Sequence, residues 1–82
     1  MRINFKQQEL IESFVGALKE KFPEVRFKEV TESPEDPNDL WVNVTRPADD
    51  DRMIELLEFS GEKTTDILMD YGYHISVMPT GR

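Results

Sequence analysis

The residue types that most often carry out catalysis are scarce in this chain. Its 82 residues include one histidine, His74, and no cysteine. A catalytic histidine needs a nucleophile or an orienting carboxylate beside it. The chain supplies no thiol and no Gly-x-Ser-x-Gly motif for that purpose. We therefore predict that the protein is not an enzyme and that His74 is a strand residue on the outer sheet face.

A run of three carboxylates, Asp49–Asp51, is the main candidate for a metal site, together with Asp36 and Asp39. Carboxylate oxygens bind Mg²⁺ and Ca²⁺, but acidic residues at a helix start also cap the helix and complement its dipole. The Pro34–Asp39 stretch lacks the spaced ligands and central glycine of an EF-hand loop. Without cysteine, thiolate metal sites and disulfides are excluded as well. We predict no metal site and no cofactor.

Charge is distributed unevenly along the chain, whose net charge is -7. Residues 1–28 contain six basic and four acidic residues, a net of +2, whereas residues 29–82 contain four basic and thirteen acidic residues, a net of -9. An acidic surface repels phosphate groups, so we expect neither general nucleic-acid binding nor binding to an anionic membrane. No apolar run reaches the roughly 20 residues that span a bilayer, and the first residues lack the apolar stretch of a signal peptide. These features predict a cytoplasmic protein.

The spacing of apolar residues predicts an amphipathic helix near the N-terminus, because side chains three and four positions apart share one helix face. The residues with this spacing are Ile11, Phe14, Val15, Leu18 and Phe22. Asn4, with Gln7 three residues later, predicts a capped start, and Pro23 predicts the end.

Alternation of apolar and polar residues predicts three strands, over Val25–Val30, Leu40–Val44 and Tyr73–Met78. Two prolines and several acidic residues in Glu32–Asp39 predict a solvated hairpin loop between the first two strands.

Helical spacing returns between Asp49 and Tyr71, and Gly72 marks an end. An unbroken helix of this length would extend about 33 Å, roughly twice the length of a five-residue strand. Glycine is unfavourable inside a helix. We therefore predict a break at Ser60-Gly61, with a restart at Thr64 or Thr65.

Together these elements predict a single α+β domain over residues 1–82. The expected architecture is a two-layer sandwich in the order helix, strand, strand, broken helix, strand, with a three-stranded sheet and the helices on one face. The predicted buried sheet face consists of Val25, Phe27, Leu40, Val42, Val44, Ile75 and Val77. The opposite face is predicted to carry Arg26, Lys28, Val30, Trp41, Asn43, His74, Ser76 and Met78.

The second of these faces is the predicted functional surface. Its central Trp41 lies between two inward-facing residues, Leu40 and Val42, and an exposed aromatic side chain beside methionine and arginine is typical of protein interfaces. We predict a small non-enzymatic module that binds another protein or its own copy, as a homodimer, through this face or an edge strand. The predicted binding residues are Arg26, Lys28, Trp41, Asn43, His74 and Met78.

The order of elements also resembles the type II KH arrangement and, more loosely, the small BolA-like proteins, over most of the chain. KH domains clamp a nucleic-acid backbone with a Gly-x-x-Gly loop between two helices. The corresponding stretch here is Ser60-Gly61-Glu62-Lys63, and Leu18–Val25 has the character of a BolA-like first helix running into a strand. The resemblance concerns architecture and implies an alternative function, the binding of single-stranded nucleic acid through Ser60, Gly61 and Lys63.

Overall fold

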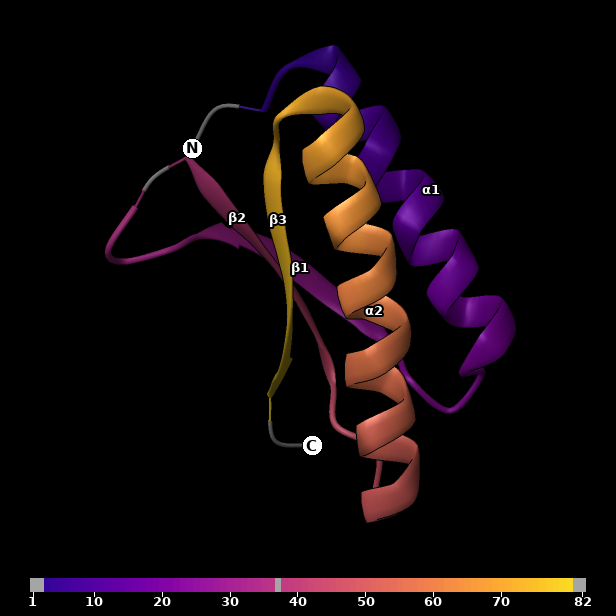
Figure 1. Cartoon of the computed structure of the whole chain (residues 1–82). Coiled ribbons are helices and arrows are strands. Elements are labelled where there is room, and N and C mark those ends of the chain that lie inside the picture. Colours follow the sequence, from indigo (N-terminus) through magenta and orange to yellow (C-terminus); the bar gives the residue numbers. More distant parts are fainter. Residues whose placement is uncertain (1–2, 37, 81–82) are drawn as a thin grey trace.

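The order of helices and strands follows the predicted arrangement (Figure 1). The computed structural model describes residues 3–36 and 38–80. They form helix α1 (Phe5–Lys21), strand β1 (Phe27–Glu32), strand β2 (Asp39–Thr45), helix α2 (Asp50–Tyr71) and strand β3 (His74–Thr80). The described chain is therefore an α+β sandwich of two helices and a three-stranded mixed sheet.

Helix α1 begins and ends where the sequence predicts. The Asn4 side chain accepts a hydrogen bond from the Gln7 backbone N–H (2.7 Å), and the Gln7 side chain accepts one from the Asn4 N–H (3.1 Å). This reciprocal capping box satisfies two N–H groups at the helix start. At the other end the Phe22 N–H donates to the Leu18 carbonyl, and Pro23 follows.

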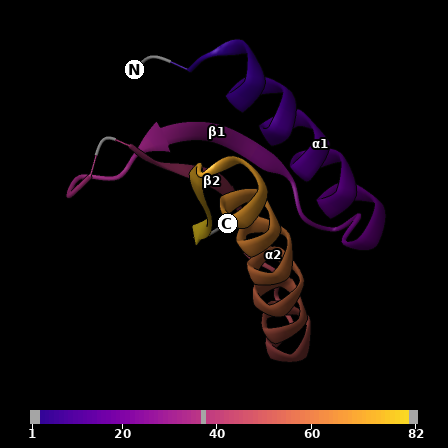
Figure 2. The same ribbon diagram turned by 45° about the horizontal axis from the view of Figure 1, so that its top comes forward.

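Strand β2 lies at the centre of the sheet, in the order β1-β2-β3. It pairs antiparallel with β1 and parallel with β3, and α2 provides the crossover that a parallel pair requires. Leu40, Val42 and Val44 are buried, whereas the intervening residues are partly exposed. Both helices lie against the same face of this sheet (Figures 1 and 2).

The predicted faces of β1 were partly wrong because the strand contains a bulge. Phe27 pairs with Val44 and Val30 pairs with Val42, with one extra residue between Phe27 and Glu29. An extra residue reverses the alternation of side chains, so Val30 packs against the core instead of the opposite face. Phe27, predicted as buried, keeps 40% of its surface exposed, and Val25 is buried but precedes the strand.

The predicted break in the second helix is also wrong, because α2 is continuous over 22 residues. Ser60 is buried and its hydroxyl donates to the Leu56 carbonyl (2.6 Å), inside the helix. The first turns of α2 extend beyond the end of β3, so the length of the helix does not have to match that of the strand (Figure 1). Gly72 ends the helix in the left-handed conformation (φ 76°). Within the described residues, no helix is both long and apolar enough to cross a membrane.

Arg52 links the overhanging start of α2 to the end of α1. Its guanidinium donates to both Glu24 carboxylate oxygens (2.8 and 3.2 Å) and to the Lys21 carbonyl (3.0 Å). The same group lies 4.5 Å from the centre of the Phe22 ring, which is completely buried. The hydrogen bond from Arg52 lowers the pKa of Glu24 below its ordinary value of 4.5.

Gly61→Ala tests the continuity of α2. In an unbroken helix alanine is favoured over glycine, and a methyl group at Gly61 meets no atom within 4 Å. We expect a gain of about 0.5–1 kcal/mol in the free energy of unfolding, measured in dilute solution by denaturant titration. The matched control is Gly16→Ala in α1, a site with the same open surroundings. Equal gains in the free energy of unfolding at the two sites support a continuous α2. A gain at Gly16 alone would instead indicate that the helix is broken at Gly61.

Glu24→Gln tests the Arg52 link through its pH dependence. Because the pKa of Glu24 is lowered in the folded protein, its contribution is complete above the ordinary value of 4.5 and is lost as the pH falls through the lowered pKa. The Tm of Glu24→Gln should therefore lie below that of the original protein near neutral pH, and the difference should close in acid. Glu20→Gln, at an exposed α1 position that forms no ion pair among the described residues, is the matched control. A difference in Tm that persists unchanged in acid contradicts the link.

Candidate functional site

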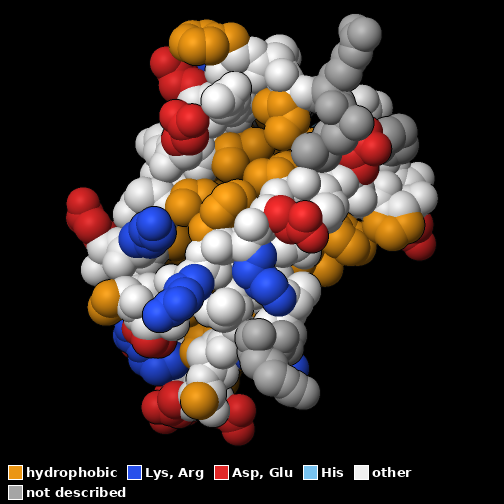
Figure 3. All heavy atoms as spheres, turned by 180° about the vertical axis from the view of Figure 1, so that it is seen from behind, with side chains coloured by type: hydrophobic (Ala, Val, Ile, Leu, Met, Phe, Trp, Pro, Cys, Tyr) orange, Lys and Arg blue, Asp and Glu red, His pale blue; other side chains and the backbone are white. Residues whose placement is uncertain are grey.

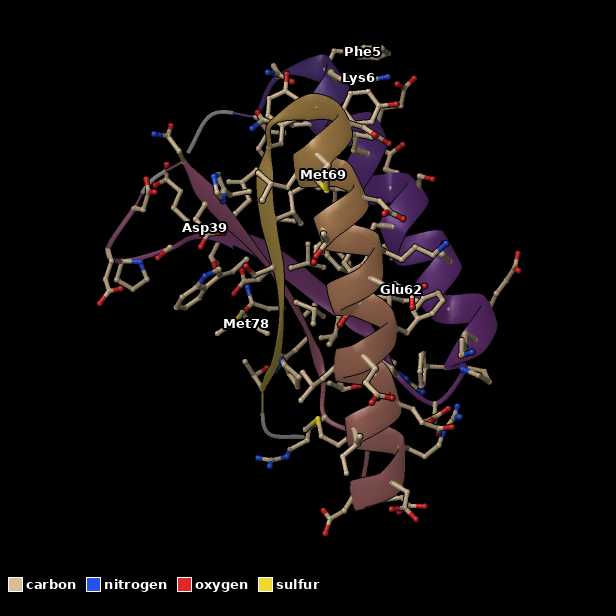
Figure 4. The ribbon with its side chains drawn as sticks, in the orientation of Figure 1. Phe5, Lys6, Asp39, Glu62, Met69 and Met78 are labelled. Carbon is tan, nitrogen blue, oxygen red and sulfur yellow. The ribbon has the colours of Figure 1, made fainter. Side chains whose placement is uncertain are left out.

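The sheet face turned away from the two helices is the candidate site. We call it the open face and define it by the residues that alternate with the buried ones. They are Glu29 and Thr31 of β1, Asp39, Trp41, Asn43 and Thr45 of β2, and His74, Ser76, Met78 and Thr80 of β3. Figure 4 shows Asp39 and Met78 on this side of the sheet, away from α1 and α2.

Trp41 lies at the centre of the open face. Its strand partners are Thr31 of β1 and Ser76 of β3, so small hydroxyl side chains flank the indole on both sides. The next open-face residue of β2 is Asn43, whose β3 partner is Met78. Trp41 and Met78 are both partly exposed. The middle strand thus places a large aromatic side chain on the open face, where it is partly exposed.

Asn43 supports this arrangement by hydrogen bonds to β1. Its Nδ2 lies 2.9 Å from the Thr31 hydroxyl and 3.2 Å from the Glu29 carbonyl, with the Trp41 carbonyl at 3.3 Å. The Glu29 carbonyl belongs to the bulged part of β1. Asn43 therefore supplies a donor at the point where the bulge interrupts the regular ladder.

Two basic residues lie at one end of the open face. Lys28, at the bulge, reaches across the sheet so that its Nζ donates to the Thr80 hydroxyl of β3 (3.1 Å). Arg26 is exposed and immediately precedes β1. Its N–H donates to the Thr45 hydroxyl, and its carbonyl accepts a hydrogen bond from the Thr45 N–H. Neither side chain forms an ion pair with a carboxylate among the described residues. This end of the face therefore has positive charge available to a ligand.

His74 and Asp39 are strand partners at the other end of the open face. His74 is exposed, and the Asp39 carboxylate accepts a hydrogen bond from the Ser76 hydroxyl (3.3 Å). His74 also borders a polar hollow next to the start of α1, together with Asn4, Gln7, Asn38, Leu40, Gly72 and Tyr73. Asn4 donates from Nδ2 to the Tyr73 hydroxyl there (3.3 Å).

The structure brings together most of the predicted binding residues. Trp41, Asn43, His74 and Met78 occupy the open face, and Lys28 extends over it, whereas Arg26 stands just outside β1. Sequence reasoning missed the threonines at positions 31, 45 and 80. Strand alternation gave a signal for Thr45, which follows Asn43 at the correct interval, but the bulge hid Thr31.

The alternative nucleic-acid loop is not formed. Ser60, Gly61 and Lys63 lie within α2, and Lys63 extends over the Phe59 ring, with Nζ 5.5 Å from the ring centre. The acidic run has a capping role, because the Asp49 side chain accepts a hydrogen bond from the Asp51 N–H (3.0 Å). Among the described residues, no group of three or more side chains is arranged to hold a metal ion.

A second exposed area follows the junction of α1 and β1. Ile11, Val15 and Phe27 line a groove there, bordered by Glu12 and Lys19. Figure 3 shows a band of hydrophobic side chains on this side of the molecule, with lysine and arginine side chains nearby. This groove contains none of the predicted binding residues.

Substitutions at Asn43 test its support of the open face. Asn43→Ala removes the hydrogen bonds to β1 and should cost about 1 kcal/mol of unfolding free energy. Asn43→Asp should cost more near neutral pH, because an ionised carboxylate cannot donate and would face the Glu29 and Trp41 carbonyls. Acid should reduce the difference, since a protonated carboxyl can donate. Denaturant titration of both variants over a range of pH checks this prediction. Equal stability of the two variants at every pH would argue against the support of the open face by Asn43.

Comparisons with protein-family models, with curated proteins and with solved structures give no match for this chain.

Proposed function

We propose that this protein is a non-enzymatic interaction module that binds a partner protein through the open face. The observation that carries the proposal is the position of Trp41, a partly exposed indole at the middle of the sheet face that both helices leave uncovered. Large aromatic side chains at a surface that is otherwise small and polar are frequent anchors of protein interfaces.

The surroundings of Trp41 support binding rather than simple exposure. The central strand pairs on both sides, so the backbone that carries Trp41, Asn43 and Thr45 is fixed before a partner arrives. Binding to a fixed surface loses little conformational entropy. The hydroxyl and amide groups around the indole can exchange water for hydrogen bonds to a partner, and Met78 adds an adaptable apolar contact.

The charges of the open face indicate what the partner should present. Lys28 contacts only a hydroxyl group at Thr80, and Arg26 is exposed at the same end. A carboxylate placed there would gain a charged hydrogen bond. The partner we propose therefore carries an apolar side chain that covers Trp41 and Met78, and an acidic side chain that reaches Lys28 or Arg26.

The surroundings of His74, the single histidine, also support a binding role for the open face. His74 is exposed at a strand end, and its strand partner Asp39 is hydrogen-bonded to Ser76.

We place the protein in the cytoplasm, a proposal supported by the absence of cysteine, since disulfides are typical of oxidising compartments.

Site-specific photocrosslinking tests the proposal. Benzoylphenylalanine at position 78, on the open face, should form a covalent adduct with the partner in cells that produce this protein. The same group at position 5 should not, although Phe5 is 80% exposed, because it lies on α1 away from the open face (Figure 4). Lys28→Glu should reduce the yield of the position-78 adduct about tenfold or more, because it replaces the attractive charge by a repulsive one.

The outcome that would overturn the proposal is also specific. A protein that folds normally by circular dichroism but gives no adduct at position 78, or equal adducts at positions 78 and 5, does not bind through the open face. Trp41→Ala serves as a second variant, and it should abolish the adduct at position 78 while the circular dichroism spectrum is retained.

A further inference from the structure

The groove between α1 and β1 combines an apolar wall with a charged rim. Six residues line it, and they are Ile11, Glu12, Val15, Gly16, Lys19 and Phe27. We call them the α1–β1 groove. Its volume is about 310 Å³, at the lower end of the range of ligand pockets, which is about 300–1,000 Å³. The groove is therefore large enough to hold side chains of a ligand.

The α1–β1 groove lies at the outer border of the sandwich. Figure 2 shows α1 alongside β1, and the sheet order β1-β2-β3 makes β1 an edge strand. The flank of α1 that faces α2 carries Leu10 and Ala17, which border a hollow between the two helices. The helix period places Val15 and Lys19 on the other flank of α1. The groove therefore opens away from α2, along the edge of β1.

The sheet is narrower than the two helices that cover it. Strands lie about 4.8 Å apart, so three strands cover about 14 Å, whereas two helices side by side cover about 20 Å. The difference of about 6 Å is close to the width of one further strand. At the α1–β1 groove the outer flank of α1 has no strand of the described chain beneath it except the edge residue Phe27. A fourth strand beside β1 would lie under this flank.

The outer edge of β1 can pair with such a strand. Among the described strands only β2 pairs with β1, so the backbone groups on the other side of β1 have no strand partner in the described chain. Edges of this kind accept extended peptides. The strand contains no proline, its bulge lies near its start, between Phe27 and Glu29, and Val30 and Thr31 beyond the bulge are uncharged. The regular part of this edge therefore offers backbone donors and acceptors to an extended segment.

The two ends of the α1–β1 groove differ in charge. At one end, Lys19 forms no ion pair among the described residues, and the exposed Arg26 directly precedes β1. At the other end, the Glu12 carboxylate accepts a hydrogen bond from the Gln8 side chain (3.3 Å), and Glu32 ends β1. A carboxylate of a ligand would gain a charged hydrogen bond beside Lys19 and would be repelled at the opposite end. The charges therefore favour an acidic residue at the Lys19 end only.

The spacing of the groove residues defines the ligand further. Val15 and Lys19 lie one helical turn apart, about 6 Å along α1. Side chains on one side of a strand repeat every two residues, about 6.8 Å. A strand beneath α1 can thus place an apolar side chain under Val15 and a carboxylate, two residues away, beside Lys19.

We propose that the α1–β1 groove binds an extended segment of a partner protein, which pairs with the edge of β1 and carries an apolar residue two positions from an aspartate or glutamate. The groove lies at the helix-covered side of the sheet, so this contact is separate from the open face and goes beyond the function proposed above. A second copy fits the groove less well, because Val30, the apolar residue of its own edge strand, already packs against its core.

Peptide selection tests the ligand class. Random dodecapeptides displayed on phage and selected on the immobilised full chain should be enriched in sequences with an apolar residue two positions from Asp or Glu. The same selection on Lys19→Glu should enrich Lys or Arg at the acidic position, because the charge at that end of the groove is reversed. No enriched sequence, or the same preference on both proteins, would overturn the proposal.

Gly16→Phe tests the location of the bound peptide. A Cβ at Gly16 meets no atom within 4 Å, so the new side chain can enter the groove without a clash. The Kd of an enriched peptide, measured by fluorescence polarisation, should rise about tenfold or more. The matched control is Gly61→Phe, at an exposed glycine of α2 with the same open surroundings, and it should leave the Kd within about twofold. Equal effects of the two variants would contradict binding in the groove.

Amide hydrogen exchange tests the pairing with β1. The bound peptide should slow the exchange of those β1 amides that face outward in the free protein. Binding that leaves the exchange of β1 unchanged would contradict strand addition. A dimer in sedimentation equilibrium that Gly16→Phe abolishes would assign the groove to a second copy and would also overturn the proposal.

The groove and the open face can be tested separately. Trp41→Ala should leave the Kd of the enriched peptide within about twofold, because the indole lies on the other side of the sheet. Gly16→Phe should leave the adduct at position 78 unchanged. Loss of peptide binding in Trp41→Ala would overturn the groove as the peptide site, whereas a protein that binds the peptide but gives no adduct at position 78 would overturn only the function proposed for the open face.

Discussion

Burial of the inner side of β2 is the interaction on which the rest of the structure depends. Leu40, Val42 and Val44 are almost completely inaccessible, and the helices pack on them through residues such as Phe14 and Leu56. A chain of 82 residues is long enough for a single hydrophobic core between one sheet face and the helices, and without disulfides that core has to hold the fold together. Covering one face of the sheet with both helices leaves the other face open, and this is where Trp41 lies. The candidate site is thus a direct consequence of how the core is built.

Local features of the sequence predicted much of this architecture. The capping pair Asn4 and Gln7, the stop at Phe22-Pro23 and the left-handed Gly72 depend on neighbouring residues only, and all occur as predicted. The alternation in β2 was equally clear, because this central strand has one buried side along its whole length. Trp41 and Asn43 could therefore be assigned to the open face from sequence alone.

The features that sequence reasoning missed depend on tertiary contacts. The bulge in β1 is visible only in the register with β2, and it moves Val30 to the core and brings Lys28 across the sheet to Thr80. The continuity of α2 through Gly61 depends on the packing of Leu56 and Ser60 before the glycine and of Ile67 after it, and on space for the helix to extend past the sheet. Helix propensity at a single glycine, worth about 1 kcal/mol, is small beside such packing.

The proposed function depends on one residue, Trp41, at the centre of the sheet face that both helices leave uncovered. The most direct test of the central claim is acrylamide quenching of the fluorescence of Trp41, the only tryptophan in the chain. The account predicts that Trp41 is quenched readily in the free protein and is protected in the complex with the crosslinked partner. Equal quenching in the two states would contradict it.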